Sequence, residues 1–520
     1  MKHKLFIGLA FTLLSATTDS FCQSAIVKDS LQSLILTPAP ADKPRINGAT
    51  VFGVRPGSPF MYNIHATGKR PMKYSVKGLP KGLTLDANTG QITGKLTSKA
   101  TYSLVIKAEN AAGNAVRNLK VVVCDEIALT PPMGWNSWNC WGIEVSQDKA
   151  MISARAFINA HLNDHGFEYI NLDDAWQGLR GGKYNAIQPD PKKFTSLKAY
   201  CDSLHKMGLK AGIYSSPWTK TYGGRVGGSA NNSEGLKDST FDIKVGFSKK
   251  KLPYDIGKYS FAAQDAKQWA EWGIDYLKYD WAPIEAFSVI EMENALKATG
   301  RDVVFSLSNN YPPTLINNIK EVAPHAQSWR TTGDINDSWK SMSSIGFNQD
   351  KWAEFSTPGH YNDPDMLVVG HVGWGKPHPT KLTLDEQYTH ISLWSLLSAP
   401  LLLGCDLAKL DAFTLNLITN DEVIDIDQDA LCKPAKRVYS KDSLDVFVKQ
   451  LADGNIAVGL FNRSSKKATI TANWNDLGIT GKQTVRDVWR QKDLEVATEK
   501  FESEVSSHGV VLVRIIPIKQ

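Results

Sequence analysis

Short apolar runs alternate with longer amphipathic stretches from about residue 126 to residue 432, and this repetition constrains the fold more than any other feature. Strand-like runs occur at eight places: 133–135, 169–173, 211–214, 276–279, 303–307, 327–330, 365–368 and 401–403. The stretches between them space their apolar residues near 3.6, as in 150–161, 197–207, 261–272 and 388–397. Repeated βα units bury parallel strands on both faces, in a doubly wound sheet or a closed barrel. Eight units favour a (β/α)8 TIM barrel, which we assign to residues 125–432.

Two regions that flank this alternation have the texture of β-sandwiches, and a chain of 520 residues has room for several domains. Between residues 45 and 124, β-type runs at 60–64, 73–76, 83–85 and 102–108 are separated by turn signals such as Asn88-Thr89-Gly90. After residue 433, alternating runs occur at 444–448, 456–461, 468–471 and 509–515. We therefore predict an antiparallel sandwich on each side of the barrel, and we give the C-terminal one, residues 433–520, a packing role.

The N-terminus has the layout of a cleavable secretory signal. Lys2 and Lys4 precede an apolar run, 5–14, that is too short to span a bilayer, and small or polar residues follow. We predict a signal peptide at 1–22, a linker at 23–44, and an exported protein that is periplasmic or extracellular and not inserted in a membrane. Lipidation of Cys22 is the alternative, but Phe21 is a poor residue to precede a lipid-modified cysteine.

Charge and cysteine spacing exclude several other classes of protein. A formal charge of +6 over 520 residues includes no dense basic block, so nucleic acid is not an expected partner. The cysteines beyond the predicted signal are far apart, which fits neither a disulfide scaffold nor a zinc site. We expect buried free thiols with at most one bridge among Cys124, Cys140, Cys201, Cys405 and Cys432.

Polar and aromatic side chains collect where the predicted barrel strands end, which is where a barrel of this kind builds its active site. In chain order they are Trp135, Trp138, Asp173, Asp174, Tyr214, Lys278, Asp280, Ser308, Arg330, Asp334, Asp363 and Asp365. Aromatic walls beside carboxylates and two cations suit a neutral sugar, because a sugar offers an apolar face for stacking and hydroxyls for charged partners. The sequence therefore points to a glycosidase.

Glycoside cleavage requires two carboxyl groups, one to attack the sugar and one to protonate the leaving oxygen. Asp280 and Asp334 are the two candidates. Lys278 lies on the same side of its strand as Asp280, and a nearby cation favours the ionised form that a nucleophile needs. Asp334 lies in the turn Thr332-Gly333-Asp334.

Six motifs resemble, in order, the strand-end motifs of glycoside hydrolase family 27, the α-galactosidases and α-N-acetylgalactosaminidases. They are MGWNSWN (133–139), YINLDDAW (169–176), GIY (212–214), YLKYD (276–280), WRTTGDINDSW (329–339) and NDPDML (362–367). The resemblance covers roughly residues 126–432 and extends more weakly into the C-terminal sandwich. Farther upstream, the stretch GLPKGLTLDANTGQITG resembles an immunoglobulin-like module of bacterial exported enzymes, usually a spacer or an adhesion unit.

The resemblance implies a retaining α-galactosidase with no metal or organic cofactor, acting on α-galactoside oligosaccharides or polysaccharide side chains. Asp280 is similar to the family's nucleophile and Asp334 to its acid/base. The implied sugar-binding residues are Trp138 as the stacking wall, Asp173 and Asp174 as acceptors for O4 and O6, Tyr214 as pocket lining, Lys278 for O3 and O4, Arg330 for O2 or O3, and Asp365 with Met366 as the floor. Adjacent aspartates suit selection of the axial O4 of galactose, since a site built to bind a hydroxyl rejects ligands that lack it.

The chain departs from the family pattern at two places. Ala175 and Ala282 replace cysteines that form bridges near the site in many members, so we expect differently shaped loops, with Trp281 narrowing the pocket. The family reads the sugar's 2-substituent after the fifth strand, where this chain has Ser308 and the run Asn309-Asn310-Tyr311. Ser308 is small enough for a 2-acetamido group, whereas Asn309 or Tyr311 would fill that space. An α-N-acetylgalactosaminidase, a β-L-arabinopyranosidase and a non-catalytic sugar-binding protein therefore stay open as alternatives, and the sequence does not indicate the oligomeric state.

Overall fold

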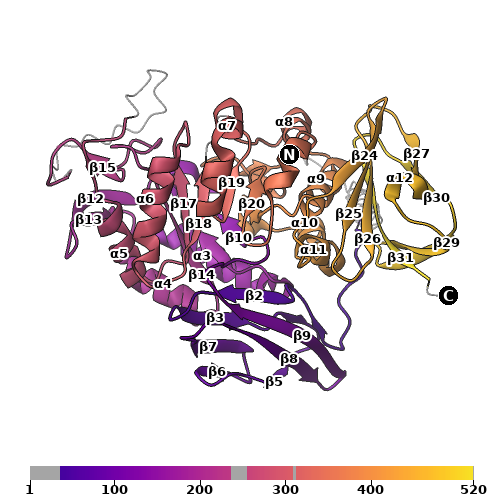
Figure 1. The fold of residues 1–520 in the computed structure, drawn as a ribbon, viewed down its shortest axis with the longest axis horizontal. Helices are drawn as coiled ribbons and strands as arrows, with labels where there is room; N and C mark the ends of the chain where they lie inside the picture. The colour runs from indigo at the N-terminus through magenta and orange to yellow at the C-terminus, as the bar shows by residue number, and fades with distance from the viewer. Residues whose placement is uncertain (1–34, 236–254, 309–311, 519–520) are drawn as a thin grey trace, which may run out of the picture.

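The computed structural model describes residues 35–235, 255–308 and 312–518. The predicted signal peptide, the first part of the linker and residues Asn309 to Tyr311 lie outside this described part. Figure 1 shows a central barrel with a β module against one end and a second β domain against one side. The fold therefore combines α/β and all-β parts, as predicted.

Eight parallel strands form the central sheet. In spatial order they are β20 (Tyr361–Asp363), β19 (Ser328–Arg330), β18 (Val304–Ser308), β17 (Tyr276–Asp280), β14 (Lys210–Ser215), β11 (Tyr169–Asn171), β10 (Met133–Asn136) and β23 (Leu401–Leu403). A parallel bridge between Leu367, just beyond β20, and Leu403 of β23 joins the two edges of the sheet. Strands such as β18, VFSLS, are buried along their whole length, as a sheet covered on both faces requires.

The seventh strand is the one that the sequence misplaced. The strand pairing lies at Tyr361–Asp363, whereas residues 365–368 were expected to form it. Pro364 has no backbone N–H to donate, and Asp365 has a φ of +80°, in the left-handed region that breaks a strand. Only Leu367 of the expected run rejoins the sheet.

Helices surround the barrel and pack on it through one continuous apolar core. They include α3 (Gln147–Asn159), α4 (Leu197–Lys206), α5 (Ala262–Trp272), α6 (Ala286–Lys297), α7 (Pro312–Val322), α8 (Trp339–Gly346), α9 (Leu384–Leu396), α10 (Ala412–Ile418) and α11 (Asp421–Asp427). Local sequence sets several of their ends. Thr383 and Glu386 form a capping box at the start of α9, and Gly273, with a φ of +91°, ends α5.

The N-terminal module has two main sheets and a short two-stranded sheet of β1 (Arg45–Ile46) and β4 (Ala66–Thr67). One main sheet contains β2 (Val51–Val54), β9 (Gly113–Val123), β8 (Ala100–Asn110) and β5 (Lys73–Lys77), and the other contains β3 (Pro59–Asn63), β7 (Gln91–Lys95) and β6 (Leu83–Leu85). The sandwich was predicted to be antiparallel, but β2 and β9 are parallel. β2 lies near the start of the module and β9 is its last strand, so no hairpin connects them and their pairing need not be antiparallel.

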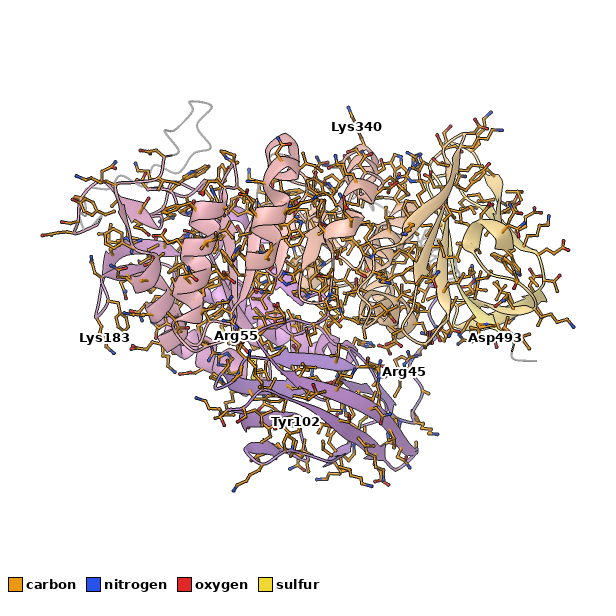
Figure 2. All side chains as sticks on the ribbon, in the orientation of Figure 1. Arg45, Arg55, Tyr102, Lys183, Lys340 and Asp493 are labelled. Atoms are coloured by element: carbon orange, nitrogen blue, oxygen red, sulfur yellow. The ribbon has the colours of Figure 1, made fainter. Side chains whose placement is uncertain are left out.

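This module closes the N-terminal mouth of the barrel. Its residues line one side of a cavity of about 140 Å³. The other side includes the first residues of four barrel strands: Met133, Tyr169, Lys210 and Val304. Charged groups cross the boundary, as in the ion pair of Arg55 with Asp302 at 3.1 Å. Arg45, which pairs with Asp425 at 2.8 Å, and Arg55 both lie where the module meets the rest of the chain (Figure 2).

The C-terminal domain is antiparallel throughout. One sheet contains β24 (Lys436–Lys441), β25 (Leu444–Gln450), β26 (Ile456–Asn462), β31 (Val510–Pro517), β28 (Gln483–Asp487) and β29 (Lys492–Ala497), and β27 (Ala468–Asn473) pairs with β30 (Lys500–Val505). Phe447 and Phe461 of this domain join the core of the barrel. Buried Lys449 donates to the carbonyls of Ser395 and Ile426, at the ends of α9 and α11. The domain packs tightly on the barrel.

The five cysteines within the described residues are free thiols, and four of them are buried: Cys140, Cys201, Cys405 and Cys432. Across the ranges that the structure covers, no helix is both long enough and apolar enough to cross a membrane.

Candidate active site

A polar pocket of about 220 Å³ opens at the C-terminal ends of the barrel strands. Its lining consists of Trp138, Asn139, Asp173, Asp174, Tyr214, Tyr222, Lys278, Asp280, Arg330, Asp334, Asp365 and Met366. Ten of the eleven residues expected to form the site therefore meet in one pocket. The eleventh, Ser308, lines a smaller cavity beside it that shares Lys278, Arg330 and Asp365.

The register of neighbouring strands brings these side chains together. Lys278 of β17 is the partner of Tyr214 on β14, and Asp280 is the partner of Ser308 on β18. Successive side chains of a strand point to opposite faces, so Lys278 and Asp280 share a face. Regular parallel pairing thus places residues that are far apart in the sequence side by side at the C-terminal end of the barrel.

Asp173 and Lys278 form a buried ion pair at the pocket wall. Lys278 Nζ lies 2.8 Å from Asp173 Oδ2, and Asn136 donates to the same oxygen at 2.9 Å. Burial opposes the charge of Lys278, but Asp173 and Asp280 outweigh it and raise the lysine's pKa. The pair therefore offers a cation and an anion side by side to a polar ligand.

Asp280 is 6% exposed, and its Oδ1 has no protein hydrogen-bond partner among the described residues. Burial raises its pKa to about 7, against the opposing effect of Lys278 and with a smaller contribution from Asp334. Lys278 favours the ionised form of Asp280, as expected, but desolvation outweighs the attraction of this one cation.

Asp334 contrasts with Asp280 in exposure, since its side chain is 64% exposed at the mouth of the pocket. Arg330 lies between two carboxylates, 3.2 Å from Asp334 Oδ1 and 2.8 Å from Asp365 Oδ2. Burial opposes the charge of Arg330, while Asp365 and Asp334 raise its pKa, so it stays a cation.

Asp174 anchors a loop over the pocket. Its Oδ1 accepts from Thr221 Oγ1 at 2.8 Å, and its Oδ2 accepts from the backbone N–H of Gly223 at 2.6 Å. Burial raises its pKa to about 6. Hydrogen bonds therefore hold this loop in a chain that has Ala175 at the position where many family members have a bridging cysteine.

Some residues differ from expectation. Trp281 is buried and packs edge-to-face on Tyr279 at 5.1 Å, so it does not line the pocket and the prediction that it narrows it was wrong. Trp135 is likewise buried, with its indole donating to the carbonyl of Cys405. Asn139 and Tyr222 were not predicted to line the pocket. Asn139 belongs to the motif that contains Trp138, whereas Tyr222 follows no strand end and carried no comparable signal.

Family comparisons agree with this architecture. The model described as "Alpha galactosidase A" matches residues 130–245 and 233–429, and "Alpha galactosidase C-terminal beta sandwich domain" matches 441–515. An immunoglobulin-like domain model matches residues 43–123.

Individual proteins give the same assignment. An α-galactosidase of Cyamopsis tetragonoloba is 37% identical over 75% of this chain and 87% of its own. A solved Bacteroides fragilis structure is 33% identical with a TM-score of 0.81, covering 93% of this chain and 100% of that one. A family 27 β-L-arabinopyranosidase of Geobacillus stearothermophilus is 27% identical with a TM-score of 0.64, covering 75% of this chain and 98% of that one. The chain therefore belongs to glycoside hydrolase family 27, the α-galactosidase family, and is a glycosidase.

Proposed function

We propose that this enzyme removes terminal α-D-galactosyl residues with retention of configuration, with Asp280 as nucleophile and Asp334 as general acid/base. The observation that supports it most is the contrast within the acid pair. Asp280 is buried at the end of β17 with no hydrogen-bond partner for Oδ1 among the described residues, whereas Asp334 lies exposed at the mouth of the same pocket. An exo-acting retaining enzyme needs one carboxylate at the enclosed anomeric carbon and one beside the departing group.

In the first step, Asp280 attacks the anomeric carbon while Asp334 gives its proton to the leaving oxygen. In the second step, Asp334 takes a proton from water, and that water displaces Asp280 from the sugar. The exposure of Asp334 suits both steps, because the leaving group departs and the water arrives from the solvent side.

Sugar selection is assigned to the pocket wall. The Asp173–Lys278 pair presents an acceptor and a donor to adjacent hydroxyls, and Trp138 offers a face on which a pyranose ring stacks. Tyr214 and Met366 complete the apolar lining. A volume of about 220 Å³ suits a single terminal sugar at the end of an oligosaccharide or a polysaccharide side chain.

The second candidate substrate is an α-N-acetylgalactosaminide, and the third is a β-L-arabinopyranoside, which keeps the hydroxyl pattern of galactose but lacks C6. Ser308 is 2% exposed, and its Oγ has no partner within the part of the chain that the structure describes, from which its neighbours Asn309 to Tyr311 are left out. Rates on the three p-nitrophenyl glycosides separate the candidates. We expect the highest kcat/KM on the α-galactoside, and a preference for either other glycoside would overturn the assignment.

We also propose that the enzyme is exported. The proposal rests on the basic, apolar and polar order of the first 24 residues. Fractionation of the native host, with activity recovered in the periplasm or the medium, would support it, whereas activity confined to the cytosol would contradict it.

A further inference from the structure

The turn that presents Asp334 is held on both sides by one oxygen atom. Asp365 Oδ2 accepts from the backbone N–H of Ile335 at 2.8 Å and lies 2.8 Å from Arg330 Nη2. Arg330 is the last residue of β19, and its Nη2 also reaches Asp334 Oδ1 at 3.2 Å. The exposed side chain of Asp334 therefore projects from a turn whose two flanks are fixed to Asp365.

Asp365 itself is rigidly mounted. It is 4% exposed, its N–H donates to Asp363 Oδ1 at 2.8 Å, and its carbonyl accepts from the Trp394 indole at 2.7 Å. Its other carboxylate oxygen, Oδ1, accepts from the N–H of Met366 at 2.8 Å. Both oxygens of Asp365 are thus engaged by the protein, which makes it a better anchor than a sugar acceptor.

We propose that Asp365 is a positioning residue for the general acid/base Asp334, which replaces the expectation that it forms the floor of the sugar site. This inference rests on the proposed function of Asp334. A general acid has to lie within hydrogen-bond reach of the leaving oxygen, and a displacement of about 1 Å costs on the order of 100-fold in rate. An exposed carboxylate on an unanchored turn would not hold that geometry.

Two substitutions test this role without straining the backbone. Asp365 has a φ of +80°, which glycine adopts freely and asparagine tolerates, whereas alanine would be strained. Asp365→Gly removes the anchor, and Asp365→Asn keeps one oxygen that can accept from Ile335. Asp442→Gly is the matched control, because Asp442 also has a positive φ, +52°, but lies exposed between β24 and β25.

The first measurement compares leaving groups. Loss of proton delivery slows substrates with poor leaving groups, such as melibiose, and spares α-galactosyl fluoride, whose leaving group needs little assistance. For Asp365→Gly we expect kcat/KM, which reports the steps up to departure of the leaving group, to fall about 100-fold on melibiose and less than about 5-fold on the fluoride. Inhibition by galactose should change less than about 3-fold, Asp365→Asn should lie in between, and the control should match the wild type.

Two outcomes would overturn the proposal. Equal losses on melibiose and the fluoride would indicate a general structural role, and a galactose inhibition constant that rises in step with the loss of rate would indicate a direct sugar contact.

The second measurement does not depend on the substrate. Hydrogen exchange of the peptide that covers residues 331–336 should be faster in Asp365→Gly than in the wild type and nearly normal in Asp365→Asn, with no change around Asp280. Unchanged exchange in the glycine variant would refute the anchoring role. If the wild type cleaved no α-galactoside, the proposed function would fail, and the exchange data would still decide whether Asp365 holds this turn.

Discussion

The two mouths of the barrel bury acidic groups to a similar degree but treat them in opposite ways. At the N-terminal mouth, Glu168 lies 2.5 Å from Lys210 and 3.2 Å from His65 of the module. Burial would raise the pKa of Glu168, but these partners lower it to about 2. At the C-terminal mouth, burial raises the pKa of Asp280 to about 7. Lys278 opposes this shift but does not cancel it, and the same lysine also pairs with Asp173.

This difference separates structural charge from functional charge. The acids at the N-terminal mouth are paired across a domain boundary and stabilise the folded chain. At the C-terminal mouth, Asp280 keeps an oxygen without a hydrogen-bond partner among the described residues, and this unsatisfied capacity for a ligand is typical of active sites. Burial alone therefore does not identify the catalytic end of a barrel, whereas incomplete pairing does.

The largest expected effect comes from Asp280→Ala. We predict a loss of at least about 10⁴-fold in kcat, because a nucleophile is removed. The free energy of unfolding should not fall, because burial raises the pKa of Asp280 despite the attraction of Lys278, so the charged carboxylate costs folding free energy. Steady-state kinetics and urea denaturation measure the two effects. Near-wild-type activity would refute the role of Asp280, and a large loss of stability would undo the contrast between the mouths.

The mirror experiment is Glu168→Ala at the other mouth. Removal of this carboxylate leaves Lys210 buried without its partner, so we predict destabilisation by about 3 to 5 kcal/mol with kcat at 25 °C nearly unchanged. Asp125→Ala serves as a control, because the pair of Asp125 with Lys99 is exposed, and its denaturation midpoint should stay at the wild-type value. A Glu168 variant as stable as the wild type would show that the ion pairs do not hold the module in place.

The pH dependence should also differ between the mouths. The nucleophile must be ionised, so kcat/KM should fall about tenfold per pH unit below the pKa of Asp280, near 7. The pKa of Glu168 is depressed, so its contribution to stability is complete above its unfolded value of about 4.3 and is lost only as the pH falls toward about 2. Activity should therefore fail at a higher pH than this part of the fold. Unfolding curves and pH–rate profiles from one preparation would contradict this if both declined together near pH 7.

The smallest effect is expected for Asn136→Ala. This change removes a 2.9 Å hydrogen bond to Asp173 and the acceptor of the Trp138 backbone N–H, but leaves Lys278 in place. A hydrogen bond of this kind contributes about 1 kcal/mol, so we predict a KM about 5-fold higher with little change in kcat. A larger effect on kcat than on KM would mean that Asn136 supports the reacting groups and not only the sugar wall.

The sequence was a good guide to the C-terminal mouth. Parallel strands bring their carboxyl ends to one side, so the strand-end rule collected Asp173, Lys278, Asp280 and Arg330 without coordinates. The strand-end rule did not predict Tyr222, because this residue reaches the pocket from a loop that Asp174 anchors. The seventh strand ends before Asp365 because this residue has a left-handed backbone conformation. The apolar pattern of residues 365–368 gives no indication of that conformation.

The N-terminal mouth was much harder to anticipate. Arg55, His65 and Asn63 follow the polar pattern of an ordinary module surface. Their partners are far away in the sequence, since Arg55 pairs with Asp302, and both His65 and Asn63 contact Glu168. Nothing in local periodicity distinguishes a solvated arginine from one that crosses a domain boundary. The sequence therefore indicated only a resemblance to modules that are usually spacers or adhesion units, and the packing of this module on one end of the barrel became clear from the structure.

Azide rescue tests the roles of Asp280 and Asp334 most directly. With an activated aryl α-galactoside, azide should restore turnover to both Asp280→Ala and Asp334→Ala. The nucleophile variant should yield β-galactosyl azide, because azide then attacks the substrate directly, and the acid/base variant should yield α-galactosyl azide from the enzyme-bound sugar. The reverse pattern, or the same anomer from both variants, would contradict the assignment.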